Sequence, residues 1–185
     1  MNTRIQSLAL VHQACWIELQ HAATQRDHPF RLLGLATVEP DGAGADLRTV
    51  LLRETQAELR TLIFFTDARS PKVAQLRAHP RATLMVWSAR LGWQLRLRVH
   101  LAIETSGLAV SSRWARLKMT PAAFDYLSPL PPGAPVERYQ PERATREHFA
   151  VVSAEVQAID WLELHADGHR RANFDAEGNG QWVVP

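Results

Sequence analysis

The chain has 185 residues, of which 46% are apolar and 22% charged, and its formal net charge is only +2 at pH 7. This profile predicts one globular domain over residues 1–185 with a single sizeable core, and the small charge argues against a general polyanion binder. Cys15 is the only cysteine, which excludes an intrachain disulfide, and its apolar neighbours favour a buried hydrophobe. Without a convincing signal peptide or a membrane-length apolar run, we expect a cytoplasmic protein.

The N-terminal segment, about Arg4 to Thr24, has the apolar period of an amphipathic helix. After Pro29 the pattern changes to short apolar runs separated by turn residues, such as those at Glu39–Gly42. The expected strands are Phe30–Val38, Leu47–Glu54, Thr61–Thr66, Ala82–Ser88, Gln94–Glu104, Val151–His165, His169–Phe174 and Gln181–Val184. The other expected helices are Ser70–His79, Ser106–Lys118 and a short one at Pro141–Phe149, after a proline-rich loop at Tyr126–Pro141. Short strands without long crossover helices favour a mainly β fold, an antiparallel barrel with helical additions (α+β).

The segment Gln94–Glu104 shows the most regular pattern in the chain. Apolar residues at every second position from Leu95 to Ile103 alternate with polar residues such as Arg96 and Arg98. This period of two predicts a half-buried strand with a polar, partly basic outer face.

Arg48 lies in an apolar strand and shares one strand face with Val50 and Leu52. An unpaired buried guanidinium is costly, so Arg48 needs solvent or an anionic partner. One interpretation is an arginine at a strand end that reaches water or pairs with a carboxylate. The other is a bidentate ligand of a phosphate group.

A second candidate anion site lies where the strand ending at Thr66 leads into a helix. Ser70 suits the helix N-cap and Pro71 the first helical position. Lys72 stands in the same first turn, where the helix dipole disfavours a cation, so a bound anion would remove a conflict. The alternative is a plain capped helix with a solvated lysine.

The order of these segments resembles the flavin mononucleotide (FMN) site of the pyridoxamine 5'-phosphate oxidase family. The matching segments are Arg48–Arg53 (RTVLLR), Phe64–Lys72 (FFTDARSPK), His79–Leu84, the strand opening at Gln94, Ile159–Leu164 and Gly168–Arg171. The resemblance spans roughly residues 30–185. It is closest to the branch of related FMN-binding proteins rather than to the vitamin B6 enzyme.

The resemblance implies an FMN-binding split β-barrel of antiparallel Greek-key type, acting as a homodimer with FMN at the subunit boundary. The residues that it implies for the cofactor are Arg48, Thr49, Val50, Leu51, Arg53, Phe65, Thr66, Ser70, Lys72, Gln94, Trp161 and Arg171. Arg48, Ser70 and Lys72 would hold the phosphate, and Gln94 would hydrogen-bond the ring. Trp161 and either Arg170 or Arg171 would reach the flavin from the other subunit.

Some positions depart from the family pattern. Pro71 stands where a second arginine is frequent, and Arg69 is the nearest residue that could compensate. Asn173 stands where the B6 enzymes carry an arginine, and Leu108–Pro121 offers Arg113 without the tyrosine and serine that would hold a substrate phosphate.

These departures favour an FMN-dependent oxidoreductase with a divergent pocket for an unknown small-molecule substrate. The alternatives are a non-catalytic FMN-binding module, such as a flavin carrier or redox sensor, and a true pyridoxamine/pyridoxine 5'-phosphate oxidase. We expect no metal site and no nucleic-acid or membrane partner. Because FMN itself would carry the chemistry, no side chain is singled out as catalytic.

Overall fold

The structure, a computed structural model, describes residues 4–138 and 148–185. The short helix expected at Pro141–Phe149 lies outside these residues except for its last two positions. Of these two, Phe149 already belongs to a strand.

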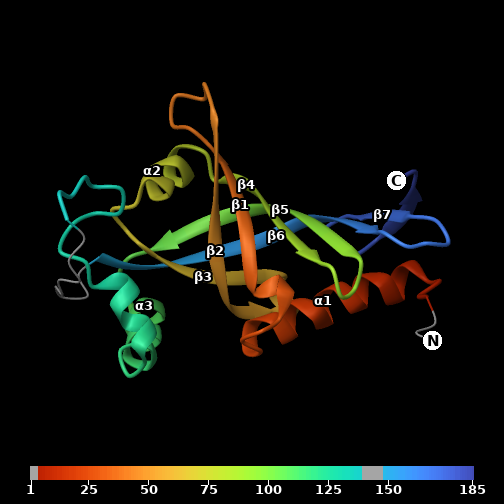
Figure 1. The fold of residues 1–185 in the computed structure, drawn as a ribbon, viewed down its shortest axis with the longest axis horizontal. Helices are drawn as coiled ribbons and strands as arrows, with labels where there is room; N and C mark the ends of the chain where they lie inside the picture. Colours follow the sequence, from red (N-terminus) through yellow and green to blue (C-terminus); the bar gives the residue numbers. More distant parts are fainter. Residues whose placement is uncertain (1–3, 139–147) are drawn as a thin grey trace.

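Eight strands form one antiparallel sheet in the order β3-β2-β1-β4-β5-β6-β7-β8 (Figure 1). Their bounds are β1 Leu32–Val38, β2 Ala45–Gln56, β3 Thr61–Asp67, β4 Arg81–Ser88, β5 Trp93–Glu104, β6 Phe149–Glu163, β7 Arg170–Phe174 and β8 Gly180–Val183. Because β3 also pairs with β6, the first six strands close into a barrel, and β7 and β8 extend from β6. The neighbouring order β4-β1-β2-β3 is that of a Greek key. The antiparallel split-barrel prediction is therefore confirmed.

The helices are additions to this barrel. Their bounds are α1 Leu8–Thr24, α2 Pro71–Ala78 and α3 Leu108–Leu117, with short 3-10 helices η1 Pro29–Arg31, η2 Ala57–Leu59 and η3 Pro121–Tyr126. The first helix begins at Leu8, later than expected, after an extended N-cap at Ser7. Arg4, which precedes the helix, forms an ion pair with Glu163 at 2.6 Å. Among the residues described, no helix has both the length and the hydropathy that crossing a bilayer needs.

The core joins α1 to the barrel. Val11, Cys15, Leu19 and Ala22 recur at helical spacing and have no exposed surface, so α1 buries one stripe against the strands. Cys15 is thus the expected buried hydrophobe, and burial raises the pKa of its thiol. A second apolar cluster, which includes Trp114, Tyr126 and Phe149, fixes α3 and η3 beside β3 and β6.

The outer face of β5 continues onto its neighbours. Along β5 the buried residues alternate with outward Arg96 and Arg98, as predicted. On β4, β1 and β2 the same face exposes large apolar side chains, namely Met85, Trp87, Leu32 and Leu47, which are 39–68% accessible. This outer barrel face therefore mixes basic and apolar groups.

We expect Gly92→Ala to lower the free energy of unfolding by about 3 kcal/mol, because both backbone strain and a clash oppose a side chain there. Gly92 has φ +67°, and an added Cβ would lie 2.6 Å from the Leu164 carbonyl oxygen. Gly42 has φ +76°, but an added Cβ would have no neighbouring atom within 4 Å, so Gly42→Ala should lower the free energy of unfolding by only about 1 kcal/mol. Urea denaturation measures both; equal losses would show that the contact with Leu164 is unimportant.

Candidate functional site

Arg48 lies near one end of the barrel and is held by several acceptors. Its guanidinium forms an ion pair with Asp46 and donates hydrogen bonds to Thr37 Oγ1, to Gln75 Oε1 at 2.7 Å and to the Leu35 carbonyl at 3.2 Å. The hydrogen bonds from Gln75 and Arg48 lower the pKa of the Asp46 carboxyl. The carboxylate pairing considered from the sequence is therefore present, and it orients the arginine toward α2.

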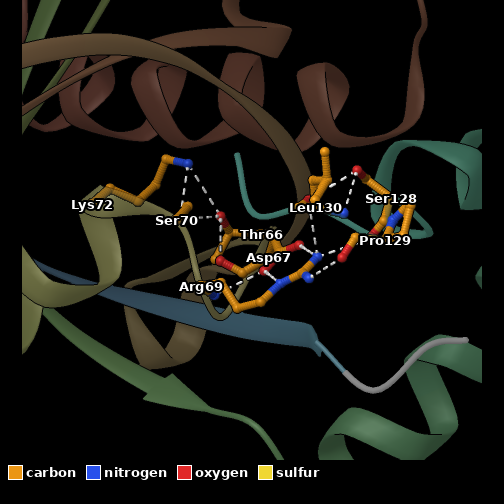
Figure 2. A network of polar contacts seen from close by, with 8 residues as sticks. All are labelled: Thr66, Asp67, Arg69, Ser70, Lys72, Ser128, Pro129 and Leu130. Carbon is orange, nitrogen blue, oxygen red and sulfur yellow. Dashed lines mark hydrogen bonds and ion pairs between the residues drawn. The ribbon is translucent and has the colours of Figure 1, made fainter. Parts of the chain in front are cut away.

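Lys72, Ser70 and Thr66 form a compact group beside Arg48. Lys72 Nζ lies 3.2 Å from both Ser70 Oγ and Thr66 Oγ1, and the two hydroxyls are themselves 3.2 Å apart (Figure 2). Burial, and next the charge of Arg48, lower the pKa of the Lys72 ammonium. Within residues 4–138 and 148–185, Lys72 forms no ion pair with a carboxylate. A partly buried cation thus has two hydroxyls as its hydrogen-bond partners, with Asp67 and Asp46 acting on it only through their charge.

Ser70 occupies the N-cap position of α2 as predicted, but its hydroxyl does not cap the helix. The side chain turns instead to Thr66 and Lys72, and both hydroxyls are almost fully buried, at 2% and 5% exposure. An ammonium, two hydroxyls and a nearby guanidinium are the donors that a phosphate oxygen accepts from. The donor set therefore fits a phosphate group.

Arg69 does not join this group. Its guanidinium pairs with Asp67 at 2.7 Å and donates to the carbonyls of Ser128, Pro129 and Leu130 at 2.8, 2.9 and 3.3 Å (Figure 2). Arg69 therefore ties the loop after η3 to the start of α2. In this structure it does not compensate for Pro71.

The remaining residues of β2 and β3 form a wall beyond this group. Val50 is buried, whereas Thr49 and Leu51 lie on the opposite, outer face of β2. The Arg53 guanidinium carbon lies 5.7 Å from the Phe65 ring centroid, so the two side chains stack. Arg53 Nε is buried without a hydrogen-bond partner, which marks an incomplete polar environment.

Gln94 and Arg171 lie together on another part of the barrel. Gln94 pairs with Leu162 of β6, and Leu162 pairs with Arg171 of β7. The two side chains thus occupy one row, two strands apart or about 10 Å. Arg171 binds Asp160 at 2.7 Å, and Arg96 binds the same carboxylate, on the outer face.

Trp161 and Arg170 face the other way. Trp161 has no exposed surface, and its ring packs in the core 5.5 Å from the ring of Trp93. Arg170 stacks on Trp161 at 5.6 Å and pairs with Glu163 at 2.9 Å. The structure therefore presents Arg171, not Arg170, outward, and it keeps Trp161 away from any surface that a ligand could reach.

The predicted site residues consequently fall into two groups far apart in one chain. Phe65 pairs with Val151 near the start of β6, whereas Leu162, beside Gln94, is near its end. Eleven residues separate these positions of β6, which corresponds to about 35 Å along the strand. Figure 1 shows α2 and α3 at one end of the long strands and β7 at the other.

Sequence reasoning missed the residues that surround Arg48. Thr37 and Gln75 are both 2% exposed, and Gln75 also donates to Asp46 at 3.1 Å. A polar residue at an inward position of β1 was a weak signal for Thr37. The sequence alone contains no signal that α2 delivers Gln75 to β2.

Comparisons with known proteins give the family to which this chain is similar. Residues 13–105 match the family described as pyridoxamine 5'-phosphate oxidase, FMN-binding domain. The chain is similar to the pyridoxine/pyridoxamine 5'-phosphate oxidase of Caulobacter vibrioides (strain NA1000 / CB15N), with 32% identity over 179 residues, 90% of this chain and 79% of the relative. A protein of the same name from Thermosynechococcus vestitus is 48% identical over 63 residues, which are 34% of this chain but only 28% of that relative.

Two solved structures share the fold. A pyridoxamine 5'-phosphate oxidase-related, FMN-binding protein from Nostoc punctiforme PCC 73102 superposes with a TM-score of 0.73 at 22% identity, covering 94% of this chain and 97% of its own. PhzG from Burkholderia lata 383, in complex with tetrahydrophenazine-1-carboxylic acid, superposes with a TM-score of 0.70 at 17% identity. The superposition covers 95% of this chain and 92% of PhzG. At these identities the likeness concerns the fold alone.

We expect Arg69→Gln to release the loop around Ser128–Leu130, because three backbone carbonyls lose their charged donor. Loss of this donor and of the Asp67 pair should lower the local opening free energy by about 1–3 kcal/mol. Hydrogen exchange of the loop amides measures the change. Arg77→Gln, on the exposed side of α2, is the control, and unchanged exchange in Arg69→Gln would contradict the tether.

Proposed function

The chain belongs to the family of the pyridoxamine 5'-phosphate oxidase FMN-binding domain, and on this premise we propose that it is a flavoprotein that binds FMN and acts as an oxidoreductase. The observation that carries the proposal is the partly buried Lys72 ammonium, which has two hydroxyl partners and, in the described residues, no ion pair with a carboxylate. A phosphate would remove the cost of that buried charge. The family resemblance and the geometry thus lead to the same group.

In this proposal Arg48, Ser70 and Lys72 hold the phosphate, with Thr66 donating its hydroxyl. The pairing with Asp46 and Gln75 keeps the Arg48 guanidinium in place before any ligand arrives, which lowers the entropy lost on binding. The backbone of Thr49–Arg53, that of Val50 included, and the outer side chains of Thr49 and Leu51 line the rest of the cofactor together with Phe65. Bound FMN supplies the hydride or electron transfer, and the protein orients it and keeps water away.

Gln94 and Arg171 belong to the proposed site only if a second copy of the chain supplies them. They lie too far along β6 from the Lys72 group to reach one extended FMN within the same chain. The outer barrel face, with Met85 and Trp87 exposed, offers a surface that a symmetric partner can cover. We therefore propose a homodimer whose two sites are each shared between the subunits.

Trp161 takes a different part in this proposal from the one that the resemblance implies. Its ring lies under β6, on the opposite side of the sheet from Asp160 and Leu162. It therefore supports the strand that carries Asp160, the partner of Arg171, instead of touching the flavin.

Turnover is favoured over a purely carrying role by an opening next to the proposed flavin wall. A pocket of about 630 Å³ includes Arg53 and Phe65 in its lining, which leaves space for a substrate beside the ring. A carrier or sensor would need no such space. The two functions differ in whether bound flavin is reduced and then reoxidised with turnover of a substrate. A true B6 oxidase is less favoured, because Arg113 is engaged by Glu54 at 2.8 Å.

The purified protein is expected to show flavin absorption in the blue and to bind added FMN, and Lys72→Met should weaken that binding at least tenfold, or about 1.4 kcal/mol. Fluorescence titration measures the affinity. Because only the protonated ammonium attracts phosphate, affinity should fall as pH rises through the lowered pKa of Lys72. Lys72→Arg, whose charge persists, should lose this dependence. Equal FMN affinity in wild type and Lys72→Met would refute the assignment.

A shared site predicts complementation between two defective variants. Lys72→Met and Arg171→Gln homodimers should each bind FMN poorly, since every site lacks one contribution. In a mixed dimer one site carries both substitutions and the other carries neither, so flavin binding should return in about half of the mixed dimers' sites. Differently tagged subunits allow these dimers to be isolated. Isolated mixed dimers that bind no more FMN than their parents would exclude sharing.

A further inference from the structure

The proposed flavin wall on β2 and the row that contains Gln94 lie at the same height of the sheet. Leu51 of β2 pairs with Leu32 of β1, and Gln94 of β5 pairs with Trp87 of β4. The register between β1 and β4, continued by two residues, aligns Leu32 with Trp87. The two parts of the proposed site are therefore separated on the outer barrel face only by β1 and β4.

A site that is shared between two identical subunits determines where their two-fold axis passes. The β2 wall of one copy must face Gln94 and Arg171 of the other, and the reverse must hold at the second site. The axis is therefore normal to the outer face and lies midway between these two parts. Because Gln94 is on β5 and Arg171 is two strands further, on β7, this midpoint falls on β4.

The surface around this midpoint meets the requirements of a two-fold axis. Each residue near such an axis faces its own copy, so a charged side chain there would meet a like charge. The strand β1 has no charged residue, and β4 has only Arg81, at its start. Met85 and Trp87 of β4 are 39% and 42% exposed and offer apolar area without charge. The outer face of β5, by contrast, carries Arg96 and Arg98.

Gly34 gives an independent indication that another chain approaches this face. It pairs with Met85 at the centre of the outer face. An added Cβ would lie 3.6 Å from the Met85 carbonyl oxygen and 3.7 Å from Leu47 Cδ1, which are ordinary contact distances. The packing of the chain itself therefore does not require a glycine at this position. A glycine inside a strand frequently marks the close approach of a second backbone or a ligand.

We propose that the two-fold axis of the homodimer passes through β4 between Met85 and Trp87, so that both side chains contact their own copies. The inference rests on the proposed function, because the shared flavin site determines where the axis lies. Leu32, Met85 and Trp87 then fill the centre of the interface, and the two flavin sites lie on its flanks. Leu47, two strands away and three residues along, is about 14 Å from the axis and about 28 Å from its own copy.

Paired charge substitutions test whether Met85 meets its own copy. Met85→Lys and Met85→Glu should each weaken the dimer at least about a hundredfold, because two like charges meet at the axis. A mixture of the two variants should form dimers again, because opposite charges then meet. Leu47→Lys and Leu47→Glu are the matched control, and any weakening that they cause should persist in their mixture. Analytical ultracentrifugation measures the dissociation constants.

Thiol cross-linking tests the same contact without a change of charge. Cys15 is the only cysteine and is buried, so an introduced cysteine is the one accessible thiol of the chain. Met85→Cys, treated with a short bifunctional thiol reagent, should give a covalent dimer. Ala102→Cys, also exposed but far along β5 and about 40 Å from its own copy, should remain uncross-linked.

Both tests are made with and without FMN, so that the two proposals fail separately. Charged Met85 variants that stay fully dimeric, or a wild-type protein that stays monomeric, would overturn the axis. It would also be overturned if Met85→Cys gave no covalent dimer, and FMN binding by that variant would then leave the flavin proposal intact. Cross-linked Met85→Cys dimers that take up no FMN would support the axis and refute the flavin proposal.

Discussion

The pairing of β3 with β6 is the constraint on which the rest of this molecule depends. It joins Thr61–Asp67 to Phe149–Glu155 in an antiparallel ladder and so turns an open sheet into a barrel without a free edge on β3. The same pairing brings the end of β3 into place, from which the chain leads through Ser70 into α2. The polar group around Lys72 therefore sits where the barrel closes. Since β6 continues far beyond this ladder, the row of Gln94 and Arg171 is forced to the other end.

The positively charged side chains of this protein differ in whether a carboxylate pairs with them. Some are held by carboxylates, as in Arg69 with Asp67 and Arg171 with Asp160. Others, such as Lys72 and Arg31, donate hydrogen bonds to hydroxyls or carbonyls and form no ion pair with a carboxylate in the described parts of the chain. Pairs of the first kind are neutralised within the chain. The second kind stores an electrostatic cost that a bound anion relieves, and in the proposed phosphate site Lys72 is of this kind whereas Arg48 is of the first.

Local patterns predicted much of this fold, and tertiary contacts explain what they missed. The alternation along β5 specified which side chains face inward, because a strand has a period of two whatever it pairs with. Ser70 and Pro71 likewise located the start of α2. The period of a strand does not indicate which residues its side chains contact, however, so the hydrogen bonds of Arg48 with Gln75 and Thr37 could not be predicted. The two-residue period of β6 also places the Trp161 side chain inward, whereas the family resemblance implied that it contacts the ligand.

The burial of Cys15 has a consequence for the chemical durability of the protein. Peroxides and other oxidants attack thiolates, and a thiol with a raised pKa and no accessible surface offers them almost none. The only sulfhydryl in the chain is therefore kept from oxidation by α1 and the barrel wall. The Cys15 thiol should therefore stay reduced when the concentration of oxidants around the protein changes.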